Sequence, residues 1–86
     1  MEYYLDGKEM KDLTAAHEHI SRTLGFPAHY GKNLDALYDC VCDLDDALIV
    51  IRNTDAMFEN LGQKANDIIG VLDDAANEGF IELEIE

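Results

Sequence analysis

The chain has 86 residues, 48% of them hydrophobic, and a formal net charge of −13 at pH 7 from 19 acidic and 6 basic residues. This length and composition predict one globular domain, residues 1–86, with a small core. The charge argues against nucleic-acid and anionic-membrane partners and favours a basic protein, although acidity that only keeps the protein soluble is an equal alternative.

A strand and a helix are expected in the first 25 residues. Residues 3–5 are apolar and end at the turn signal Asp6-Gly7, so they predict a short strand. The helix that follows is expected to have Thr14 as its N-cap and to stop at Gly25. Its apolar positions recur at helical spacing: Leu13, Ala16, Ile20 and Leu24.

Residues 33–43 predict a helix with two unlike faces, and they are the most informative part of the chain. Asn33 is its expected N-cap. One face is apolar and consists of Leu34, Leu37, Tyr38 and Val41. Another face, called the acidic ridge below, consists of Asp35, Asp39 and Asp43. Like charges four residues apart weaken a helix, so an unpaired ridge suggests a surface that meets a basic partner.

The second half of the chain predicts two strands separated by two helices. Residues 48–51 are all apolar, which is typical of a strand buried on both faces. Helices are expected at residues 54–61, capped by Thr54, and at residues 65–78. Residues 80–86 alternate, so Ile81, Leu83 and Ile85 are expected to face the core. Helical connections between all strands predict an α/β fold, a small three-stranded parallel sheet packed with about four helices.

No recognisable catalytic or metal-binding pattern is present. No Ser or Cys lies in a nucleophile elbow, and there is no Gly-rich phosphate loop. His17 borders an apolar stripe and is expected to be half-buried, whereas His19 is expected to be exposed. The acidic runs at residues 43–46 and 73–74 lack the spacing of an EF-hand. We expect no enzyme, no cofactor and no metal. The alternative from another class is an enzyme or metal-dependent regulator that uses the carboxylate clusters.

The cysteines and the N-terminal residues bear on location. Cys40 and Cys42 lie two apart on the expected helix, so they cannot form a disulfide with each other. Cys40 is expected in the core and Cys42 to be partly exposed. The first residues lack the pattern of a signal peptide, and no stretch reaches the roughly 20 apolar residues that span a bilayer. We therefore expect a cytoplasmic protein.

Residues 29–41, His-Tyr-Gly-Lys-Asn-Leu-Asp-Ala-Leu-Tyr-Asp-Cys-Val, resemble the signature of the barstar family, the intracellular inhibitors of the secreted ribonuclease barnase. The similarity extends over essentially the whole chain. It implies a three-stranded parallel sheet with four helices, the second of which plugs a ribonuclease active site together with the loop before it. That site binds RNA phosphates, so an inhibitor carboxylate would replace a phosphate and form charge-assisted hydrogen bonds.

The resemblance also implies which residues bind the partner. Asp39 would be the phosphate surrogate, and Asp35 would contact polar groups of the nuclease. Gly31 and Asn33 would shape the loop. Asp74 and Glu78, four apart on the last helix, would add acidic contacts. The other implied contact residues are His29, Tyr30, Tyr38, Cys42 and Asp43.

Several of these positions depart from the family pattern. His29 replaces a phenol, which would make stacking on the nuclease pH-dependent. Tyr38 and Leu44 replace Trp, Cys42 replaces Thr, and Asp74 replaces Glu. Tyr30 and Tyr38 could also be core aromatics with hydroxyls at the surface.

We expect this protein to inhibit a secreted, guanyl-specific, barnase-type ribonuclease by binding it one-to-one. We also expect this protein to be monomeric when free. The alternative is an acidic protein-binding adaptor of the same fold with a different basic partner or toxin.

Overall fold

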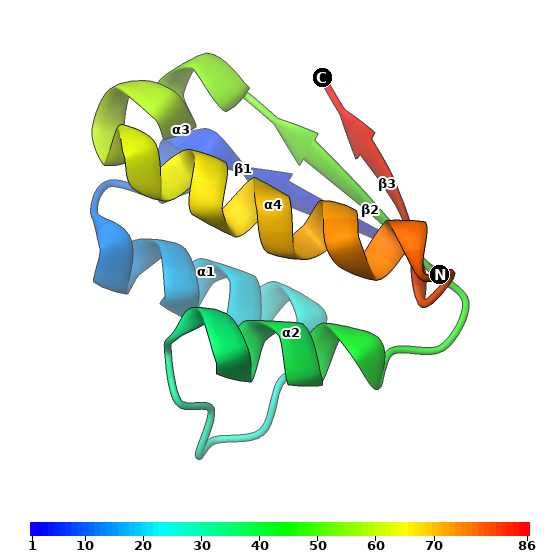
Figure 1. Ribbon diagram of the computed structural model, residues 1–86. Coiled ribbons are helices and arrows are strands. Elements are labelled where there is room, and N and C mark those ends of the chain that lie inside the picture. The colour runs from blue at the N-terminus through cyan, green and yellow to red at the C-terminus, as the bar shows by residue number, and fades with distance from the viewer.

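The computed structural model describes all 86 residues. Three strands, four α-helices and one short 3-10 helix follow one another in the order β1 (Glu2–Asp6), η1 (Gly7–Glu9), α1 (Leu13–Leu24), α2 (Leu34–Cys42), β2 (Ala47–Arg52), α3 (Thr54–Leu61), α4 (Gln63–Asn77) and β3 (Ile81–Ile85) (Figure 1). No helix is both long and apolar enough to cross a bilayer.

The strands form a single parallel sheet in the order β1-β2-β3, so β2 is the central strand. β1 pairs with β2 from Glu2 opposite Leu48 to Asp6 opposite Arg52. All three strands run in the same direction, because the helices between them return the chain to the end of the sheet at which the previous strand began. The predicted α/β fold, with its three-stranded parallel sheet and four helices, is confirmed.

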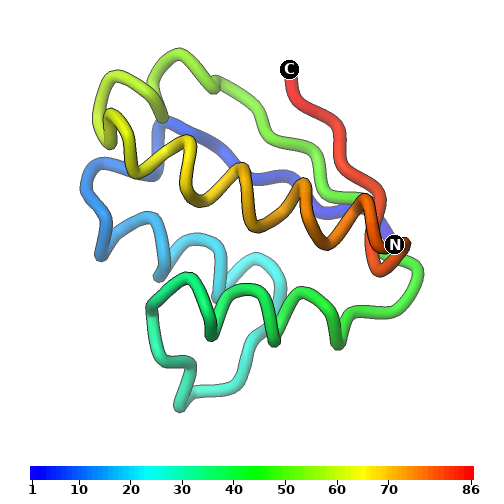
Figure 2. The backbone as a smooth tube through the Cα atoms, viewed as in Figure 1, coloured from blue at the N-terminus to red at the C-terminus, as the bar shows by residue number.

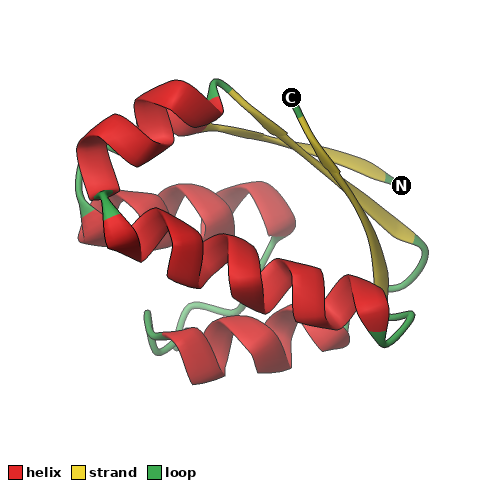
Figure 3. Cartoon of the chain, turned by 45° about the horizontal axis from the view of Figure 1, so that its top comes forward, coloured by secondary structure: helices red, strands yellow, loops and turns green.

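The helices gather on one side of the sheet and enclose the core between them and the strands (Figure 3). Helices α1 and α4 contact the strands, while α2 packs against α4 on the outer side of the helical layer. The residues that fill this core without any exposure include Leu5, Ile20, Leu37, Val41, Ile49, Ile51, Ile68 and Leu72. This arrangement leaves one long face of α2 open to solvent.

The opposite face of β2 is covered by side chains of the neighbouring strands and by no helix. Val50 is 3% exposed beside Tyr4 and Glu84, its partners in the register, whereas Leu48 is half-buried. The expected burial of β2 on both faces therefore holds at Val50 and only in part at Leu48.

Two predicted helix caps are wrong. The N-cap of α1 is Asp12, whose Oδ1 accepts a hydrogen bond from the backbone N–H of Ala15 at 2.8 Å, so Thr14 lies inside the first turn. Thr54 begins α3, but its hydroxyl donates to the backbone carbonyl of Glu86 at 2.8 Å. In α1 an earlier carboxylate, that of Asp12, makes the capping bond instead of Thr14. In α3 the hydroxyl of Thr54 bonds to a carbonyl far away in the sequence and does not cap its own helix.

On the core side of β3, the exposure of the side chains increases from the start of the strand to its end. Ile81 is 6% exposed, Leu83 is half-buried and Ile85 is 53% exposed. The expectation that Ile85 faces the core is therefore wrong, because β3 is an edge strand whose far end runs away from α4 (Figure 1).

Candidate partner-binding surface

Asn33 fixes the start of α2 and the loop before it. Its Oδ1 accepts a hydrogen bond from the backbone N–H of Ala36 at 2.8 Å, which confirms the predicted N-cap. Its Nδ2 donates to the carbonyl of Gly31 at 3.3 Å. A Cβ on Gly31 would lie 3.3 Å from the Cβ of Ala36, so the loop packs closely on the first turn of the helix. The loop between α1 and α2 projects from the helical layer (Figure 2).

All three carboxylates of the acidic ridge are exposed. The protein has two ion pairs, both elsewhere: Lys32 with Glu18 and Arg52 with Glu86. No basic residue lies in the last turn of α2, so the negative end of the helix dipole adds to the charge of Asp43, its C-cap. The ridge is therefore a line of negative charge with no cation of its own.

The side chain of Tyr38 joins α2 to α4. Its ring is half-buried against the core, and its hydroxyl donates a hydrogen bond to the carboxylate of Glu78. This bond to a negative group raises the pKa of Tyr38 above its ordinary value, so the hydroxyl keeps its proton. Glu78 and Asp74, one turn before it, are both exposed. The structure thus brings Glu78 beside α2, a contact that sequence spacing did not reveal.

Tyr30 belongs to the core. It is 8% exposed, and its hydroxyl lies 2.7 Å from Nδ1 of His17, which is 2% exposed. The ring also packs at a tilt on Phe26, with 5.1 Å between centroids. Burial lowers the pKa of His17 and raises the pKa of Tyr30 to about 12. Of the two alternatives for Tyr30 the core position is correct, and its ring is not offered to a partner by the free protein.

The remaining histidines and one leucine differ in exposure. His29 is exposed in the loop. His19 was expected to be exposed but is half-buried, with Nε2 accepting a hydrogen bond from the backbone N–H of Asp6 at 3.0 Å. Leu34 is 38% exposed although it shares the spacing of the apolar face.

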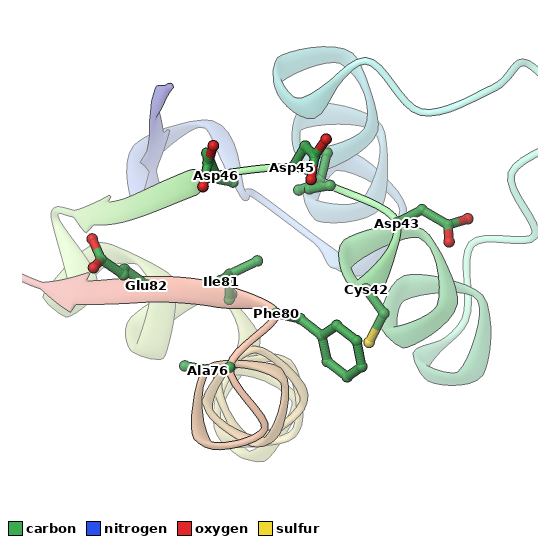
Figure 4. A pocket seen from close by; sticks show the side chains of 11 residues that line it. Cys42, Asp43, Asp45, Asp46, Ala76, Phe80, Ile81 and Glu82 are labelled. Carbon is green, nitrogen blue, oxygen red and sulfur yellow. The ribbon is translucent and has the colours of Figure 1, made fainter.

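A cleft of about 800 Å³ opens at the C-terminal end of α2 (Figure 4). It lies between the loop at residues 43–46 and the turn from α4 to β3. Cys42, half-buried as expected, lies at its wall, and Cys40 is also half-buried rather than fully in the core. Nowhere do three or more His, Cys, Asp or Glu side chains come together in a way that could hold a metal ion. The cleft is formed by segments far apart in the sequence and was not predicted.

Comparison with known proteins agrees with this fold. The family model described as "Barstar (barnase inhibitor)" matches residues 1–84. The chain therefore belongs to the barstar family. It is also 33% identical over 76 residues to the Bacillus subtilis (strain 168) protein named "Putative ribonuclease inhibitor YrdF", an alignment that covers 86% of this chain and 84% of that protein.

Proposed function

We propose that this protein inhibits a secreted, guanyl-specific, barnase-type ribonuclease by covering its active site with α2 and the loop before it. The observation that carries the proposal is the acidic ridge, three exposed carboxylates on one helix face without an intramolecular cation. An active site that binds RNA phosphates offers Arg, Lys and His side chains, and unpaired carboxylates form strong charge-assisted hydrogen bonds with them. Membership of the barstar family and the name of the Bacillus subtilis relative support an inhibitory role.

Asp39 is the proposed phosphate surrogate because it lies at the centre of the ridge. Asp35 and Asp43 flank it by one helical turn on either side, so both would reach basic groups at the rim of the same active site. Glu78, held beside α2 by Tyr38, extends this surface onto α4. Asp74 adds a further charge one turn earlier on α4.

The loop is proposed to contribute shape and one titratable ring. Asn33 and Gly31 hold the loop against the start of α2, so the surface is formed before the partner arrives. His29 is exposed there and would stack on the nuclease. We further propose that the protein acts in the cytoplasm and binds its partner one-to-one. We also propose that it is monomeric when free, because a net charge of −13 makes copies repel each other.

The proposal is tested by titrating the protein into a barnase-type ribonuclease assay. Wild type should abolish activity at a one-to-one ratio. Asp39→Ala should weaken binding by roughly 100- to 4,000-fold, since basic nuclease groups would be buried without a partner at a cost of about 3–5 kcal/mol. Glu59→Ala is the matched control, because Glu59 is an exposed acid on α3. No inhibition by wild type, or equal behaviour of the two variants, would contradict the proposal.

Salt provides an independent test of the charge argument. Complementary charge speeds association, an effect for which the barnase–barstar pair is itself a standard illustration. Because the Debye length is about 10 Å at 0.1 M salt and about 3 Å at 1 M, the association rate constant should fall steadily over this range. Stopped-flow mixing measures it directly. An association rate that ignores salt would show that the acidic ridge does not steer the encounter.

An adaptor of the same fold with a different basic partner or toxin is the second candidate. It is favoured by the Tyr38–Glu78 hydrogen bond, which engages a carboxylate that would otherwise be free for a nuclease. Wild type that leaves the ribonuclease fully active yet captures another basic secreted protein through Asp39 would establish this candidate.

A further inference from the structure

The cleft at the end of α2 continues the acidic face onto a second part of the chain. Cys42 and Asp43 of α2 line one wall, and Phe80, in the turn between α4 and β3, lines the other. The ring of Phe80 points across the cleft toward Cys42 (Figure 4). Phe80 is 44% exposed, so a large aromatic face is available to a group that enters the cleft.

The turn that carries Phe80 is fixed. Gly79 has a φ of 86°, a left-handed conformation that suits glycine after a helix. Its N–H donates to the carbonyl of Ala76 at 3.0 Å, and the N–H of Phe80 donates to the carbonyl of Ala75 at 3.0 Å. These two hydrogen bonds form a Schellman motif. Because the backbone of Phe80 is already ordered, burying its ring against a partner requires little further loss of conformational entropy.

The lining of the cleft is also negatively charged, and in Figure 4 its carboxylates lie apart from the ring of Phe80. The carboxylates that line the cleft belong to Asp43, Asp45, Asp46 and Glu82. None of them takes part in an ion pair within the protein. Neither α2 nor α4 has a basic residue in its last turn, so both helix dipoles present their negative ends near this region.

An arginine side chain is the group that fits a cleft with an aromatic face and with carboxylates elsewhere in its lining. Its guanidinium is planar and weakly hydrated, so it stacks on a ring, and its positive charge is attracted by the carboxylates of the cleft. An ammonium group lacks this flat face and is strongly hydrated. A purely apolar side chain would leave the surrounding carboxylates without a partner.

We propose that this cleft receives an arginine side chain of the basic ribonuclease, with the ring of Phe80 as the stacking platform. The inference rests on the proposed function, because Asp43 belongs both to the acidic ridge and to the cleft wall. A nuclease that covers α2 therefore brings its next surface segment to the mouth of the cleft. Phe80 becomes a specificity-determining residue that lies outside α2 and its loop.

The test measures the dissociation rate of a barnase-type ribonuclease from wild type, Phe80→Ala and Phe80→Leu. The matched control is Phe58→Ala, because Phe58 is 39% exposed on α3, at the other end of α4 (Figure 1). Both Phe80 variants should dissociate about tenfold faster than wild type, since each loses the stacked cation. Phe58→Ala should match wild type. A stoichiometric titration gives the folded, active fraction of every variant, and Phe80→Leu preserves an apolar side chain if Phe80→Ala folds poorly.

The outcomes separate this inference from the proposed function. Dissociation of both Phe80 variants at the wild-type rate, with Asp39→Ala still weakened, would overturn the inference and leave the function standing. Phe80→Leu that matches wild type while Phe80→Ala dissociates faster would show an apolar occupant and overturn the arginine assignment. Wild type that fails to inhibit the nuclease would overturn both.

Discussion

Removal of a single hydroxyl, Tyr30→Phe, should destabilise the whole domain. The hydroxyl of Tyr30 lies 2.7 Å from Nδ1 of His17, and the two residues are only 8% and 2% exposed. The substitution leaves the ring in place but removes the hydrogen-bond partner of a buried imidazole nitrogen. An unsatisfied buried polar group costs about 1–3 kcal/mol, so the free energy of unfolding should fall by about that amount. In a domain of this size each kcal/mol corresponds to roughly 4–8 °C in Tm.

Urea unfolding followed by circular dichroism measures this loss. Tyr3→Phe is the control, because the hydroxyl of Tyr3 makes only an exposed contact with the sulfur of Met1 at 3.4 Å. Its free energy of unfolding should stay within about 0.5 kcal/mol of wild type. The Nδ1 resonance of His17 should shift in Tyr30→Phe and not in Tyr3→Phe. Equal stability of wild type and Tyr30→Phe would refute the claim that this hydrogen bond stabilises the domain.

Four further substitutions test other parts of the structure. Leu37→Ala should lower the free energy of unfolding by about 2–5 kcal/mol because the side chain is fully buried. Leu34 is 38% exposed, so Leu34→Ala should lower the free energy of unfolding by about 1 kcal/mol or less. Similar losses for the two variants in urea unfolding would contradict the assigned face of α2. Asn33→Ala removes an N-cap and should cost about 0.5–2 kcal/mol, with faster amide exchange at Ala36, and an unchanged exchange rate there would argue against the cap. Burial holds the pKa of His17 below its usual 6.5, so the unfolded chain binds more protons as pH drops; stability should be level above pH 6.5 and fall as pH decreases through the folded-state pKa. His17→Gln should remove that part of the pH dependence in urea unfolding between pH 5 and 8, and a profile identical to wild type would contradict it.

The order of elements could be predicted because its signals are local. Asn33 caps α2 through a backbone N–H only three residues away. Gly25 has a φ of 73°, which glycine adopts without strain, so it ends α1 where the sequence indicates. Helices between every pair of strands leave the parallel sheet as the natural arrangement. The exposure of the acidic ridge follows in the same way, since helical spacing places it away from Leu37 and Val41.

Side-chain burial was harder to predict because it depends on distant neighbours. Tyr30 can be buried because its hydroxyl forms a hydrogen bond with Nδ1 of His17, which lies on the preceding helix. His19 is half-buried because β1 offers it a backbone N–H. Ile85 continues the alternation of β3 but is 53% exposed at the end of this edge strand, so the alternating pattern did not predict its burial. The cleft beside Phe80 requires two separate segments to meet, and no pattern within one segment could indicate it.

The acidic ridge has a consequence for protein engineering. Three like charges at successive turns oppose α2, so the free protein should gain stability from added salt, while its complex with a basic partner should weaken under the same conditions. A redesign that scored only the melting temperature would therefore select neutral or basic residues at Asp39 and Asp43, whereas Asp35 suits the first turn of the helix. The most stable variants obtained in this way would lack two of the carboxylates proposed to bind the nuclease.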